Sequence, residues 1–209
     1  MKEFLPSDST LLKMKRSRPT TNTKDRDIRE PLISWIASRH PADGSTGIIQ
    51  EFEMPRPSAR IDLAVVNGEM SGFEIKSDAD TLIRLRSQVP AFSRFFDKVS
   101  LVTTQRHLPC ARKMIPEWWG IMVFKQEGAF RVVRSAKQNR NTDVSSLLFA
   151  LTKAEIVEIA QRAGLKMRIS QKKADMTGSV VIEISESDLF VYARDIIRKR
   201  TDSVILQGS

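Results

Sequence analysis

Apolar and polar residues alternate on both sides of the dipeptide Asn67-Gly68, which predicts a β-hairpin over residues 60–76. The apolar positions of its two strands are Ile61, Leu63, Val65, Phe73 and Ile75. These side chains can share one face only if the loop has an odd number of residues, such as three with Gly68 in the left-handed conformation. A two-residue turn would pair Asp62 with Phe73 and mix the two faces.

The same register places Asp62, Glu74 and Lys76 together on the opposite face of the hairpin. Two neighbouring carboxylates repel each other unless a cation lies between them, and hard oxygen ligands suit Mg²⁺, with Mn²⁺ as its substitute. A lysine beside such a metal can orient a water molecule and stabilise charge in a phosphorane-like transition state. The pattern therefore favours phosphodiester hydrolysis. The alternative is that all three are ordinary solvent-facing strand positions.

The motif Asp62, eleven intervening residues and Glu74-Ile75-Lys76 resembles the PD-(D/E)xK nuclease superfamily, whose fold is restriction-endonuclease-like. The resemblance implies an α/β core of a helix, three antiparallel strands, a helix and a strand, covering about residues 25–125. It also implies metal ligation by Asp62, Glu74 and the backbone carbonyl of Ile75, with Lys76 as the catalytic lysine. Arg60-Ile61-Asp62 stands where the Pro-Asp dipeptide is found, and Trp118-Trp119-Gly120 resembles one bacterial family of unassigned function within the superfamily.

A helix is predicted from Asp27 to the residue before His40, with Glu30 near its start. Glu30 has two explanations, which the sequence leaves open. Its spacing from Asp27 is that of a capping box, and the resemblance alternatively implies an acid from this helix that completes the metal environment and serves catalysis. A strand follows over residues 48–54, from which Glu51 and Glu53 could approach the site, although acids on an exposed strand face are the simpler interpretation. After Lys76 the pattern predicts a helix, a strand at residues 99–103, a helix containing Cys110, and two strands near residues 120–124 and 129–133.

The chain divides into three parts: a basic flexible arm (1–24), the nuclease core (25–140) and a small helical C-terminal region (141–209). In the last part, Thr152 and Glu155 form a capping box for a helix that Gly164 ends. The basic loop after that helix makes the segment resemble a SAP-type nucleic-acid-binding module. Gly178 and the β-branched run at 180–182 do not favour the second helix that this module requires.

The 209-residue chain carries a net charge of +9, which favours a polyanionic partner, here DNA, with RNA not excluded. Residues of the second predicted helix, of the strip after residue 125 and of the C-terminal region could contact phosphate. They are Arg84, Gln88, Arg131, Arg134, Lys137, Arg140, Lys172 and Lys173. The sequence leaves a homodimer open.

The chain has no run of about 18 apolar residues, and residues 1–6 lack the apolar core of a signal peptide. Its single cysteine fits a reducing compartment. We therefore predict a cytoplasmic protein without a membrane partner. The function expected from the sequence is a Mg²⁺-dependent nuclease acting on DNA. The alternatives are a catalytically inactive nucleic-acid-binding or adaptor protein of the same fold, and a structural partner whose charge serves only solubility.

Overall fold

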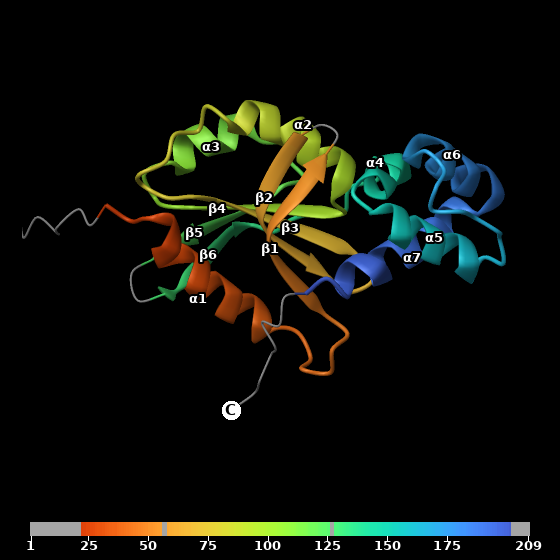
Figure 1. The fold of residues 1–209 in the computed structure, drawn as a ribbon. Helices are drawn as coiled ribbons and strands as arrows, with labels where there is room; N and C mark the ends of the chain where they lie inside the picture. Colours follow the sequence, from red (N-terminus) through yellow and green to blue (C-terminus); the bar gives the residue numbers. More distant parts are fainter. Residues whose placement is uncertain (1–21, 56–57, 126–127, 202–209) are drawn as a thin grey trace, which may run out of the picture.

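The computed structural model describes residues 22–55, 58–125 and 128–201. A six-stranded sheet lies between α1 on one face and α2 and α3 on the other, and four further helices pack together beside it (Figure 1). The helices are α1 (Asp25–Ala37), α2 (Leu85–Phe95), α3 (Leu108–Met114), α4 (Val144–Phe149), α5 (Lys153–Arg162), α6 (Lys173–Glu183) and α7 (Glu186–Arg198). The strands are β1 (Gly47–Pro55), β2 (Ser58–Val66), β3 (Met70–Lys76), β4 (Lys98–Thr103), β5 (Gly120–Phe124) and β6 (Phe130–Arg134).

The strands follow one another across the sheet in chain order. The pairs β1–β2, β2–β3 and β5–β6 are antiparallel, and β3–β4 and β4–β5 are parallel, with α2 and α3 as their connections. The predicted α/β class and the helical nature of the C-terminal region are confirmed, whereas a restriction-endonuclease-like core in particular is not. Apart from its last three residues, the predicted basic arm lies outside the described residues. Within those residues, no helix combines the length and the apolar character needed to cross a bilayer.

The β2–β3 hairpin has the odd-numbered loop that the hydrophobic pattern predicts. Val66 pairs with Met70, so residues 67–69 form a three-residue loop, and Gly68 has a φ of 95°. Leu63 pairs with Phe73 in the same register. A residue without a Cβ adopts this φ without steric strain, which is why the loop uses glycine here. The hairpin register is therefore confirmed.

Two apolar clusters fill the two faces of the sheet. Ile28, Leu32 and Ile36 of α1 pack on the face that contains Leu63, whereas the larger cluster joins α2 and the C-terminal helices to the other face. The prediction that Ile61 shares a face with Leu63 is wrong, because Ile61 belongs to the larger cluster. The β2–β3 pairing ends at Leu63. Ile61 is paired with β1 instead, so its side chain can turn away from the face that contains Leu63.

Helix α6 forms despite the features that did not favour it. It spans Gly178 and the β-branched residues 180–182. Its inner side buries Met176, Thr177 and Val180 against the neighbouring helices, and the Thr177 hydroxyl donates to the Lys173 carbonyl at 2.9 Å. Burial in a tertiary core outweighs a few tenths to about 1 kcal/mol of unfavourable helix propensity per residue.

The C-terminal helices are tied to the sheet by Asp97, which follows α2 and has only 4% of its surface exposed. Its Oδ2 accepts a hydrogen bond from the Met70 N–H at 2.7 Å, and its Oδ1 pairs with Arg194 Nη2 of α7 at 2.8 Å. Arg194 Nη1 also donates to the Gly68 carbonyl at 3.1 Å. One guanidinium thus joins α7 to the loop of the β2–β3 hairpin.

We expect Arg194→Leu to lower the free energy of unfolding by about 2 kcal/mol, because it removes a hydrogen-bonded charge from the buried Asp97. Urea unfolding at neutral pH, followed by circular dichroism, measures the effect. Arg112→Leu is the control: Arg112 is exposed on α3 and makes no ion pair within the described part of the chain. Equal midpoints for the two variants would contradict a stabilising role for this contact.

Candidate functional site

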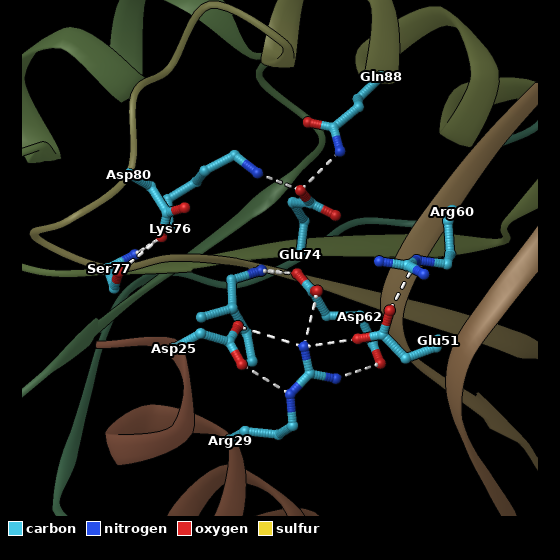
Figure 2. Close-up of polar contacts among 11 residues, drawn as sticks. Asp25, Arg29, Glu51, Arg60, Asp62, Glu74, Lys76, Ser77, Asp80 and Gln88 are labelled. Atoms are coloured by element: carbon cyan, nitrogen blue, oxygen red, sulfur yellow. Dashed lines mark hydrogen bonds and ion pairs between the residues drawn. The ribbon is translucent and has the colours of Figure 1, made fainter. Parts of the chain in front are cut away.

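A polar cleft of about 390 Å³ opens where β2 begins and β3 ends, between α1 and α2 (Figure 2). It brings together Asp62, Glu74 and Lys76, as the hairpin register predicted, and it also contains Arg84 and Gln88. Its other charged lining residues are Asp25, Arg29, Glu51, Arg60 and Asp80. The site therefore contains nearly equal numbers of acidic and basic side chains.

Arg29 of α1 supplies the cation beside Asp62. Its Nη2 lies 2.9 Å from Asp62 Oδ1 and 2.8 Å from Glu51 Oε1, and its Nε lies 2.8 Å from Asp25 Oδ1. Asp62 Oδ2 accepts the Ile75 N–H at 2.7 Å. Burial by itself would lower the pKa of Arg29, but the hydrogen bond and charge of Asp25, with the charges of Asp62 and Glu51, raise it above its ordinary value. Each of these three acids thus has a cationic partner within the protein.

Glu74 and Lys76 form a buried ion pair, each with 2% of its surface exposed. Glu74 Oε1 accepts hydrogen bonds from Lys76 Nζ and, at 2.7 Å, from Gln88 Nε2 of α2. Glu74 Oε2 is buried and has no hydrogen-bond partner within the described residues. Burial raises the pKa of Glu74 to about 7, against the opposing charge of Lys76. Burial also raises the pKa of Asp62, opposed by the Ile75 N–H and by Arg29.

Glu30 lies outside this cleft, exposed on α1. The helix begins at Asp25, two residues before the predicted start, and Lys24 is its N-cap. The Lys24 N–H donates to Asp27 Oδ2 at 2.9 Å, so Asp27 fills the place in the capping arrangement that was assigned to Glu30. Sequence reasoning missed Arg29 and Asp25. Their i, i+4 spacing signals a helical ion pair but not the direction in which it points.

The residues predicted to contact phosphate do not form one surface. Arg131 and Arg134 lie on β6, at the opposite edge of the sheet from β1 and the C-terminal helices (Figure 1). Arg134 donates to the carbonyls of Trp119 (2.6 Å) and Pro116 (2.9 Å), and Arg131 donates to Gln105 Oε1 at 3.0 Å. Burial lowers the pKa of Arg134. Arg134 therefore serves to hold its own strand.

Lys137 and Arg140 follow β6 and are exposed. Arg84 and Gln88 line the cleft, as described above. The other two predicted residues begin α6: Lys172 is its exposed N-cap, and Lys173 Nζ donates to the Phe149 carbonyl at 2.7 Å. Gln88 and Lys173 therefore have contacts within the protein.

The basic residues at the end of α7 are also engaged in internal contacts. Arg198 Nη2 and Lys199 Nζ lie 2.8 and 3.0 Å from the two oxygens of Asp195, and Arg200 pairs with Glu155 of α5. In contrast, Lys166, Arg168 and Lys172, on or beside the α5–α6 loop, are exposed and make no ion pair with any residue that the structure describes. The loop between α5 and α6 and its flanks thus present three exposed cationic side chains that have no carboxylate partner among the described residues.

The fold and site define a mixed α/β protein with a polar cleft in which Asp62 and Glu74 are paired with the protein's own Arg29 and Lys76. The family described as bacteriophage P4 protein cII matches residues 18–206, and the chain belongs to this family. Protein cII of Enterobacteria phage P4 is 27% identical over 145 residues, which cover 68% of this chain and 54% of the relative. The chain thus spans about half the length of that curated relative. A solved structure, the SPO1766 protein of unknown function from Silicibacter pomeroyi, is similar with a TM-score of 0.41 and 19% identity, covering 71% of this chain and 100% of that one.

The family match corrects the resemblance to the PD-(D/E)xK superfamily, which is wrong, and with it the predictions of a nuclease, a hydrolase and a metal-binding protein. The expectation of Mg²⁺ or Mn²⁺ came from the neighbouring carboxylates of Asp62 and Glu74 as well as from this classification. Within residues 22–55, 58–125 and 128–201, no group of three or more His, Cys, Asp or Glu side chains is arranged to hold a metal ion. The motif misled because an Asp and a Glu-x-Lys on paired strands also suit an internally ion-paired cluster.

Proposed function

We propose that this protein binds nucleic acid without cleaving it, and that the loop between α5 and α6 makes the main phosphate contacts. The loop and its flanks carry Arg162, Lys166, Arg168, Lys172 and Lys173, and the sequence has no acidic residue between Glu158 and Asp175. Proteins that neutralise phosphates in this way gain affinity from the release of counterions.

The loop is held in shape by its own hydrogen bonds, which leaves its cations pointing away from the core. Gln171 Oε1 accepts the Arg168 N–H at 2.9 Å, and the Gln171 N–H donates to the Arg168 carbonyl at 3.1 Å. Lys172 then begins α6 without a side-chain cap. The amide groups at the first turn of a helix attract anions, so this end of α6 adds to the positive charge of the loop, against which Asp175 in the same turn acts.

The contrast between the two basic clusters carries the proposal. The cluster at the end of α7 forms ion pairs inside the protein through Arg198, Lys199 and Arg200. The cluster at the loop is exposed and makes no ion pair within the described residues; it consists of Lys166, Arg168 and Lys172. A basic group already paired with a carboxylate must exchange one partner for another to bind phosphate, which gains little. The unpaired cations of the loop gain the full electrostatic attraction.

Changing Lys166, Arg168 and Lys172 together to alanine should weaken binding to a labelled DNA or RNA duplex or single strand roughly 100-fold at physiological salt. The slope of log affinity against log salt should decrease in magnitude by about 3, since each lost phosphate contact removes about 0.9. Fluorescence anisotropy at several salt concentrations measures both quantities, and parallel DNA and RNA series identify the preferred polymer.

The matched control changes Arg86, Arg112 and Lys113 to alanine. These residues are exposed on α2 and α3, and the substitution removes the same net charge. It should alter affinity by only the small factor expected from long-range charge. If both triple variants bind alike, or if the wild type binds no polynucleotide, the proposed function is wrong.

A further inference from the structure

We infer that a groove between the β1–β2 pair and the α4–α5 turn binds a single strand of nucleic acid, an inference that rests on the proposed function. The groove has a volume of about 890 Å³. One side is formed by β1 and β2, and the other by residues 149–152, where α4 ends and α5 begins. Figure 1 shows α4 beside the β1–β2 end of the sheet.

The groove is lined by more basic than acidic residues, which favours a phosphate backbone. It is lined by the cations Arg60, Arg84, Lys173 and Arg200 and by the acids Glu51 and Glu53. Arg84 is exposed and makes no ion pair within the part of the chain that the structure describes, whereas Arg60 pairs with Glu51 and Arg200 with Glu155. Arg84 is therefore the cation most available to a phosphate.

The groove is continuous with the proposed phosphate-binding loop at one end and with the polar cleft at the other. Lys173 lines the groove and directly follows Lys172 of the loop. Arg60 and Arg84 line both the groove and the cleft that contains Gln88. A strand held by the loop can therefore extend past Lys173 and along the groove to Arg84.

The groove favours a single strand because its wall contains an aromatic side chain. Phe149 is half-buried and lines the groove beside Leu151. Unpaired bases stack on aromatic rings in proteins that bind single strands, with little dependence on sequence. A duplex keeps its bases stacked inside and offers the groove only its backbone. Phosphates on Arg84 with a base on Phe149 are the contacts expected of a single strand.

Arg84→Glu tests this inference against Arg86→Glu, which makes the same charge change on the same helix at a residue that does not line the groove. Anisotropy is measured with a labelled single strand and with a duplex of equal length. We expect Arg84→Glu to bind the single strand at least about fivefold more weakly than Arg86→Glu, which is the loss of one phosphate contact. The two variants should bind the duplex equally.

Phe149→Leu keeps an apolar side chain but removes the ring, and it should weaken single-strand binding at least about fivefold with little effect on the duplex. Thermal unfolding shows whether the Phe149→Leu variant folds. If it does not fold, the comparison of Arg84→Glu with Arg86→Glu tests the inference. If Arg84→Glu and Arg86→Glu bind the single strand alike, or if Arg84→Glu weakens both polymers equally, the inference is overturned. Loss of binding in the Lys166, Arg168 and Lys172 variant would still support the proposed function in either case.

Discussion

Replacing Lys76 with methionine should lower the free energy of unfolding by about 3–5 kcal/mol at pH 8. Methionine fills a similar volume, but it leaves the Glu74 carboxylate, with 2% of its surface exposed, without its cation. The remaining hydrogen bond from Gln88 does not neutralise the charge. Glu74 must then either remain ionised in the core or take up a proton at a pH that disfavours it. Urea unfolding measures the loss.

Two controls separate this effect from the removal of any lysine. Lys98→Met breaks the ion pair between Lys98 and Glu69, in which the two side chains are 36% and 35% exposed. This substitution should lower the free energy of unfolding by less than about 1 kcal/mol. The double variant Glu74→Leu with Lys76→Met removes both charges and should recover most of the lost stability. If the Lys76→Met variant is no less stable than the Lys98→Met variant, Lys76 does not stabilise the folded protein by pairing with Glu74.

The stability of the wild-type protein should fall as the pH rises from about 4.5 to about 7, through Glu74. The pKa of this group is raised by burial from 4.5 to about 7, so in this interval the folded state holds a proton that the unfolded state has released. Stability decreases with pH wherever the folded state binds more protons. The contribution lost is on the order of 3 kcal/mol.

The side chain of the Glu74→Gln variant cannot titrate. The free energy of unfolding of this variant, minus that of the wild type, should therefore increase across this pH interval. Urea unfolding at closely spaced pH values measures the difference. Glu155→Gln is the control with the opposite sign. Burial alone would raise the pKa of Glu155, but hydrogen bonds from Arg200 and Thr152 lower it. Its contribution is present above pH 4.5 and is lost only below it. A Glu74→Gln difference that stays constant between pH 5 and 7.5 would contradict the raised pKa.

Local patterns in the sequence determined the elements whose geometry depends on neighbouring residues. The alternation around Asn67-Gly68 was enough to predict an odd-numbered loop and the register of β2 and β3. The capping box was enough to predict the start of α5, because Thr152 accepts the Glu155 N–H and the Glu155 carboxylate accepts the Thr152 N–H. The helix also ends as predicted, with Gly164 at a φ of 75°. These interactions span three or four residues and so can be read from the sequence.

Only the tertiary structure decided which charges meet in the cleft. Successive residues of a helix point about 100° apart, so the burial of Ile28 and Leu32 against the sheet directs Arg29 into the cleft and leaves Glu30 exposed. The hairpin register brought Asp62 and Glu74 to one site, but it could not reveal that Arg29 and Lys76 neutralise them there. The same spacing of acids suits a metal site or an ion-paired cluster. What distinguishes the two is the cation that another element delivers, and that depends on how distant parts of the chain pack.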